Sequence, residues 1–218
     1  MKSKNKCLWV LFAFLAICIG LYPLAYFSSA YKRYSLLASK SQELLANATY
    51  MTIFYIHISL GGVALLAGWS QFSKPWRNKY PAFHRYVGYI YIISVFVSSI
   101  AGFIIAFFAT GGAIAGVGFG TLAVLWFASI LFAFVNIKRG NIKEHEKWMI
   151  RNYALAFAAV TLRVYLPFAV LGTRDMGQAL QIVSWLCWIP NAIVMETYIR
   201  RQDGELKRKN KDPMLLDP

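Results

Sequence analysis

The stretch HEKWMIRNYALAFAAVTLRVYLP, residues 145–167, decides the fold class, because a basic entry leads into an apolar run with an arginine deep inside it. Apart from Arg163, residues 148–171 are overwhelmingly apolar. About 20 such residues in a helix cross the roughly 30 Å hydrocarbon core of a bilayer. The stretch therefore predicts a transmembrane span.

Arg163 is the least expected residue of this span. Counted at 1.5 Å per residue, it lies about 22 Å from the charged end, past the bilayer midplane. A cation at such depth costs about 2.5–3.5 kcal/mol and usually faces a bundle interior or a cavity. Helical spacing places it on one stripe with other polar and small residues, namely His145, Asn152, Ala156 and Ala159. Two interpretations remain: a polar site inside a helix bundle, or a close-packing seam from which Arg163 snorkels outward.

Composition excludes an ordinary soluble domain. Hydrophobic residues make up 58% of the 218 residues and charged residues only 15%. The net charge of +14 comes from short basic blocks between apolar runs, where membrane topology and anionic lipid explain it better than nucleic acid does. The three cysteines show no CxxC or Cys/His spacing, so neither a disulfide framework nor a metal site is indicated.

The apolar runs predict an all-α fold, a polytopic transmembrane bundle of about six spans. Residues 1–28 form a first span, favoured over a cleaved signal peptide, and residues 29–49 form an exterior loop or surface helix. Residues 50–200 form a five-span core, whose last helix is expected to kink at Pro190–Asn191, and residues 201–218 a disordered cytoplasmic tail. Most Lys and Arg residues fall on one side, which places both termini in the cytoplasm of a multi-pass protein of the cell inner (plasma) membrane.

Two phrases resemble a known family. They are HRYVGYIY, residues 84–91, and HEKWMIRNY, residues 145–153, the latter continued by AAVTLR, residues 158–163. Together they resemble the DUF2306 family of bacterial predicted membrane proteins, over roughly residues 57–191. The resemblance implies a polytopic membrane domain with these histidines and arginines in the family pattern. It implies no reaction.

The three histidines of the chain each begin a helical stripe of small residues, and they fall at two expected depths. His57 and Arg163 lie in the outer half of the bilayer, about 10–12 Å below its outer surface. His84 and His145 lie at cytoplasmic helix starts. The sequence therefore predicts two polar layers, joined by the helix that carries both His145 and Arg163.

One hypothesis is a membrane redox protein. His84 and His145 would bind a b-type haem axially, Arg85 and Arg151 would hold its propionates, and aromatic residues would line the pocket: Tyr86, Tyr91, Trp148 and Tyr153. A quinone bound by one histidine and an arginine is a related alternative. No cofactor is singled out between them.

A second hypothesis is a binding or transport protein. The cytoplasmic set His84, His145, Arg85 and Arg151 would hold an anionic lipid headgroup, since a guanidinium suits phosphate and carboxylate. A deeper ligand or proton path would use other residues, namely His57, Arg163, Asn152 and Asn191. A third reading is a structural or accessory subunit. The bilayer is the expected partner, and an oligomer or a membrane complex stays open, as does an enzymatic role.

Overall fold

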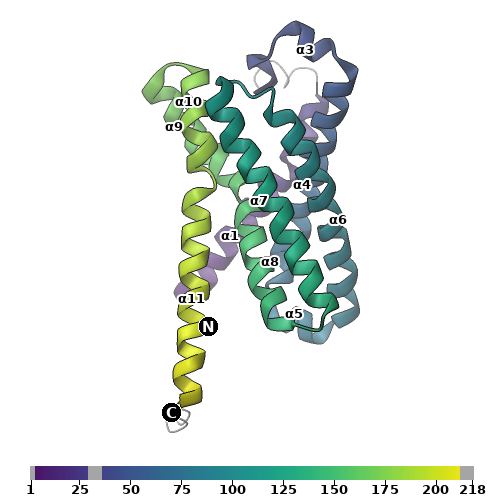
Figure 1. The fold of residues 1–218 in the computed structure, drawn as a ribbon, viewed down its shortest axis with the longest axis vertical. Coiled ribbons are helices and arrows are strands. Elements are labelled where there is room, and N and C mark those ends of the chain that lie inside the picture. Colours follow the sequence, from purple (N-terminus) through teal and green to yellow (C-terminus); the bar gives the residue numbers. More distant parts are fainter. Residues whose placement is uncertain (1–2, 29–35, 212–218) are drawn as a thin grey trace.

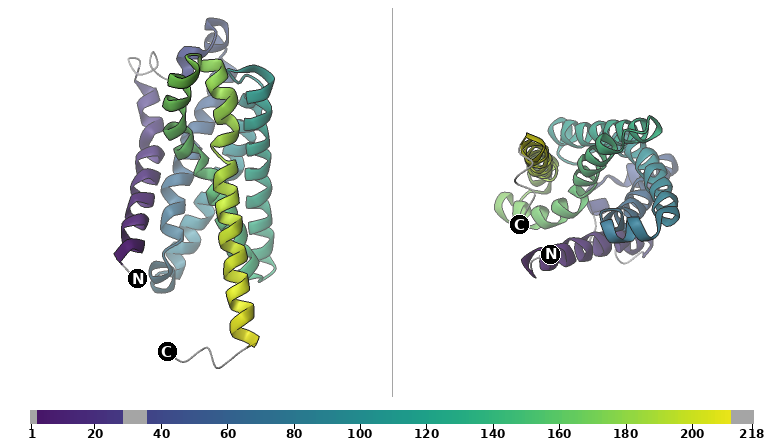
Figure 2. Two further views of the ribbon diagram at one scale, coloured as in Figure 1. Left: turned by 90° about the vertical axis from the view of Figure 1, so that its left-hand side faces the viewer. Right: turned by 90° about the horizontal axis from the view of Figure 1, so that it is seen from below.

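A computed structural model describes residues 3–28 and 36–211, and within them every regular element is a helix. Six stretches of these residues are long and apolar enough to cross a membrane: Trp9–Phe27, Ala48–Gln71, Pro81–Ala106, Gly112–Lys138, Ile142–Thr173 and Met176–Glu205. The predicted all-α, six-span bundle is therefore confirmed (Figure 1). Figure 2 shows both chain ends at the end of the bundle that carries α5. We call this the basic end and the opposite one the outer end.

The first span consists of α1 (Ser3–Leu21) and a 3₁₀ turn, η1 (Tyr22–Phe27). Pro23 lies in the first turn of η1, where its missing N–H costs no hydrogen bond. The span packs on α4 (Ala48–Gln71) through two glycines: a Cβ on Gly62 would approach the carbonyl oxygen of Gly20 to 2.5 Å. Small residues thus set the distance between these helices, as expected where lipid supplies no hydrophobic driving force.

The segment between the first two spans lies at the outer end. Its described part contains η2 (Leu36–Ser39) and α3 (Gln42–Ala46), in the region for which a loop or surface helix is predicted. Residues 29–35 lie outside the described part. The side chain of Asn47 then accepts a hydrogen bond from the Tyr50 amide at 3.0 Å, which caps α4 and starts the second span.

Four helices form the centre of the bundle. After the short α5 (Lys74–Lys79), α6 (Pro81–Ala106) packs between α4 and α7 (Gly112–Lys138), and α7 also packs on α8 (Ile142–Ala156). The tight turn from α6 to α7 uses Gly111 at φ 105°, a left-handed conformation that favours glycine. The buried core between these helices is rich in aromatic and aliphatic residues, among them Tyr91, Val95, Trp126, Ile130 and Tyr153.

The fifth and sixth spans are each interrupted, which the sequence predicts only for the sixth. Phe157 separates α8 from α9 (Ala158–Thr173), so residues 148–171 are two helices instead of the one expected. Cys187 and Trp188 separate α10 (Met176–Leu186) from α11 (Ile189–Lys211), just before the expected kink at Pro190. The Thr161 hydroxyl of α9 donates to the Cys187 carbonyl, which satisfies a backbone group at the second interruption, while the Phe157 carbonyl accepts from the amides of Val160 and Thr161.

Helix α11 continues to Lys211 and extends beyond the rest of the bundle at the basic end (Figures 1 and 2). Residues 201–211 are therefore helical, where a disordered tail is predicted; residues 212–218 lie outside the described part. Ion pairs are found in and just before this part of α11. Lys147 on α8 contacts Asp203 at 2.8 Å, and within α11 Arg200 contacts Glu196 at 3.1 Å.

Candidate functional site

An elongated cavity of about 250 Å³ lies in the outer half of the bundle. It begins at Ser39, Lys40 and Thr110 and reaches inward to Leu65 and Trp126. Along α4 its wall extends from Tyr50 to Leu65, about 22 Å at 1.5 Å per residue. Its volume is close to the lower end of the range for small-molecule sites, roughly 300 Å³. Most of its lining is apolar.

His57 forms part of the cavity wall in a fixed orientation. Its Nδ1 lies 2.9 Å from the carbonyl oxygen of Ser98 on α6, and because a carbonyl can only accept, Nδ1 donates. The Ser98 hydroxyl in turn donates to the His57 carbonyl at 2.8 Å. The ring fits because its neighbour on α6 is Gly102, where a Cβ would come within 2.8 Å of Cε1. These contacts leave Nε2 as the remaining polar atom of the ring.

Arg163 lines the same cavity from α9. Its Nη1 donates to the Ala159 carbonyl at 2.7 Å, and its guanidinium lies 4.4 Å from the centre of the Tyr22 ring. The arginine is near enough to His57 and Tyr26 to interact with both electrostatically. The structure therefore brings together the two residues for which the sequence predicts an equal depth.

Lys40 completes the polar part of the lining, although its sequence context does not predict a place in the site. Its Nζ donates to the Phe108 carbonyl at the end of α6. Beside it, the hydroxyls of Ser39 and Thr110 are hydrogen-bonded at 3.0 Å, which joins η2 to the α6–α7 turn over the cavity. Partial burial lowers the pKa of Lys40 from its ordinary value of 10.5. A single lysine in a polar segment between two spans gives no pattern in the sequence that would predict this position.

Asn152 is fully buried and lies outside the cavity lining. Its Oδ1 accepts from the Tyr91 hydroxyl at 2.5 Å, and its Nδ2 donates to the Trp126 carbonyl and the Ser129 hydroxyl, both at 2.8 Å. The residue thus joins α6, α7 and α8 through one amide. Asn152 therefore has a structural role in the packing of these three helices.

Asn191, the other amide predicted for a ligand path, also binds protein groups. Its Nδ2 lies within hydrogen-bond distance of the Ala154 carbonyl at 3.3 Å, the Thr161 hydroxyl at 3.2 Å and the Cys187 carbonyl at 3.0 Å. It therefore connects α11 to α8 and α9 at the two helix interruptions. The cavity lining does not include it.

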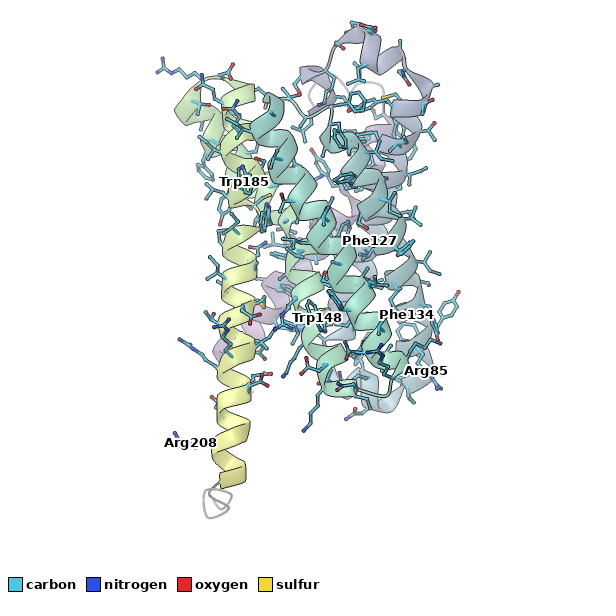
Figure 3. The ribbon with its side chains drawn as sticks, viewed as in Figure 1. Arg85, Phe127, Phe134, Trp148, Trp185 and Arg208 are labelled. Atoms are coloured by element: carbon cyan, nitrogen blue, oxygen red, sulfur yellow. The ribbon has the colours of Figure 1, made fainter. Side chains whose placement is uncertain are left out.

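The predicted cytoplasmic set lies at the basic end. His84 is near enough to His145 for electrostatic interaction, and His145 Nδ1 donates to the Ala133 carbonyl at 2.9 Å. Arg151 pairs with Glu196 of α11 at 2.9 Å. Arg85 is exposed at the lower edge of α6 (Figure 3). The two histidines are thus neighbours, while each arginine has separate surroundings.

These residues do not fit a haem. Tyr86, predicted to line a pocket, is 68% exposed, whereas Tyr91 is fully buried and holds Asn152. The Trp148 ring is already occupied by protein groups: Phe132 lies 4.7 Å away and the Arg151 guanidinium 4.8 Å away. Tyr86, Tyr91 and Trp148 therefore have separate surroundings and do not enclose one planar group.

Six apolar helical spans around a buried core and an internal cavity define the class: a polytopic α-helical membrane protein. Within this class, the chain belongs to the family described as predicted membrane protein (DUF2306), whose model matches residues 54–199, more than half of the chain. The match confirms the resemblance and includes His57 and Arg163 but not Lys40. No curated protein and no solved structure shows significant similarity to the chain.

Proposed function

We propose that this protein binds a small amphipathic molecule in the intramembrane cavity. The observation that carries the proposal is that His57 and Arg163, from different spans, line one cavity whose other walls are largely apolar. A few convergent polar groups in an apolar cavity are typical of a small-molecule site. Ionisable residues inside a membrane commonly mark such sites.

The chemistry of the two side chains suits an oxygen-bearing polar group. Arginine is a permanent cation whose N–H groups recognise carboxylates and phosphates. His57 presents Nε2, which accepts a hydrogen bond when the ring is neutral and donates one when it is protonated. A ligand would place its polar group between these residues and its apolar part deeper, toward Leu65. The same arrangement would serve storage, presentation or transport of that ligand in the inner membrane of a cell.

The experiment is a binding measurement on purified protein in detergent. Native mass spectrometry with added hexadecanoic acid or hexadecanol is expected to show saturable binding of one molecule per chain. His57→Ala and Arg163→Gln are expected to reduce occupancy by at least one of the two probes. Arg174→Gln is the matched control, because Arg174 is exposed at the outer end and does not line the cavity.

The proposal fails if wild-type protein saturably binds neither these two probes nor hexadecyl phosphate nor a benzoquinone that carries a ten-carbon chain. It also fails if both cavity variants fold and bind as the wild type does. In the latter case, the polar residues serve helix packing alone, which is the structural interpretation of the same residues.

A further inference from the structure

The cavity has a polar outer part and an apolar inner part. Its outer part contains Lys40, His57, Arg163 and the hydroxyls of Ser39 and Thr110, among apolar side chains such as Phe54 and Ile105. Its inner part is lined by apolar side chains, among them Leu65, Phe119, Leu122, Ala123 and Leu155. A lipid of the outer leaflet has the same polarity along its length, with its headgroup outward and its chain toward the bilayer centre.

Lys40 is held at the outer part by packing. Its near neighbour Leu37 is only 2% exposed and belongs to a small core with Tyr26 and Phe54. Tyr26 in turn interacts with Arg163 and is hydrogen-bonded to the backbone of Leu36, the first residue of η2. The segment that carries Lys40 is thus attached to the same side chains that surround Arg163.

The contact of Lys40 does not neutralise it. Its Nζ donates to the Phe108 carbonyl, a neutral dipole, and none of the ion pairs found among residues 3–28 and 36–211 includes Lys40. Lys40 and Arg163 therefore both border the cavity, Lys40 at its outer end and Arg163 from α9. Charge-assisted hydrogen bonds from such groups favour an anionic acceptor over a neutral one.

We infer that the ligand is a single-chain amphiphile with an acidic headgroup, a carboxylate or a phosphate monoester, bound head-outward. This inference rests on the proposed function. Arg163 and His57 bind the acidic group, Lys40 attracts it from the outer end of the cavity, and the chain occupies the apolar inner part toward Trp126. Lys40 is thus a specificity-determining residue that selects acidic over neutral headgroups. A cavity whose wall follows α4 for about 22 Å suits an extended chain better than a broad ring system.

The test compares four probes on the full chain in detergent: hexadecanoic acid, hexadecyl phosphate, hexadecanol, and a benzoquinone that carries a ten-carbon chain. Saturable occupancy is measured by native mass spectrometry, with thermal unfolding as a second readout. For wild-type protein, the affinity for the acid or the phosphate is expected to be at least roughly tenfold higher than the affinity for the alcohol. One charge-assisted hydrogen bond accounts for about a tenfold difference in affinity. Comparison of the acid with the phosphate identifies the source of the acidic group.

The variants separate headgroup selection from general binding. Lys40→Gln is expected to lower acidic-probe affinity roughly tenfold and leave hexadecanol binding unchanged, whereas Lys40→Arg is expected to retain the preference for acid. Lys143→Gln is the control, because Lys143 is an exposed lysine at the basic end. Because Lys40 is partly exposed and lies outside the spans, these variants are expected to fold, which thermal unfolding checks.

Three results would overturn the inference while leaving the proposed function intact. They are equal binding of acid and alcohol by the wild type, an acid preference that persists in Lys40→Gln, and tighter binding of the quinone than of either acidic probe. Absence of saturable binding for all four probes would instead contradict the proposed function itself.

Discussion

The imidazole of His57 lies directly against Gly102, at a distance that leaves no room for a side chain. A Cβ at Gly102 would lie 2.8 Å from Cε1 and 2.9 Å from Nδ1 of the ring. The absence of that carbon lets His57 donate to Ser98 while it borders the cavity. A backbone position on one span thus determines where an ionisable group of another span lies.

Substitution of Gly102 is expected to displace His57 and weaken ligand binding. Gly102→Ala introduces an overlap in a packed contact, a change that costs about 1–3 kcal/mol and forces the ring to move. Gly88→Ala is the matched control, because Gly88 is on the same helix and a Cβ there would meet nothing within 4 Å. Thermal unfolding and probe binding are measured for both. Identical binding by the two variants would show that the orientation of His57 is unimportant.

Removal of the Asn152 amide is expected to destabilise the bundle without touching the cavity. Asn152→Ala removes the acceptor of the Tyr91 hydroxyl and the donor to the Ser129 hydroxyl, and polar contacts of this kind within membranes contribute on the order of 1–2 kcal/mol. Asn136→Ala, where the side chain donates only to its own helix at Phe132, is expected to have little effect. Denaturant titration gives the unfolding free energies. A greater loss of stability in Asn136→Ala than in Asn152→Ala would contradict the structural role of Asn152 in helix packing.

The end of α11 is expected to depend on one ion pair with α8. Asp203→Asn removes the contact with Lys147, and because both side chains are partly exposed the loss is about 0–1 kcal/mol and decreases with salt. Hydrogen exchange in residues 201–211 is therefore expected to accelerate, with no change in the spans. Glu205→Gln serves as the control. Equal protection in Asp203→Asn and wild type would mean that helix propensity alone holds this segment.

Binding of the acidic probes is expected to weaken at alkaline pH. The loss is expected at a lower pH than for a lysine with the ordinary pKa. Burial lowers the pKa of Lys40 below 10.5, so the folded protein releases this proton before the unfolded chain does. Between those two pKa values the unfolded state binds more protons than the folded state, so the contribution of Lys40 to folding stability rises with pH. Over the same pH range Lys40 loses its positive charge and therefore its attraction for an acidic ligand. Titration of hexadecanoic acid binding against pH checks this. Lys40→Arg is expected to keep its affinity over the same range.

The purified protein is expected to show no haem spectrum. The aromatic residues near His84 and His145 do not enclose a planar group, since Tyr86 is exposed and Trp148 is packed against Phe132. The measurement is a reduced-minus-oxidised difference spectrum of protein expressed with a haem precursor. A Soret band that disappears in His145→Ala would contradict this expectation and restore the redox hypothesis.

Local sequence properties predict the bundle well but predict its site only in part. The stripe from His145 to Arg163 is expected to share one helix face, yet the interruption at Phe157 divides it. Asn152 enters the core, whereas Ala156 before the interruption and Ala159 and Arg163 after it all border the cavity. Phe157 is neither proline nor glycine, and the partners that stabilise the interruption, Thr161 among them, are recognisable only once the helices are placed.

The sequence by itself determined that this chain is a six-span membrane protein of the DUF2306 family, because the length and apolarity needed to cross a bilayer are properties of each segment alone. It also predicted that His57 and Arg163 lie at one depth. Only the tertiary structure decided that they border a common cavity and that Lys40 joins them. Those contacts depend on how closely helices approach at residues such as Gly102, and on the packing of Leu37, which no single segment specifies.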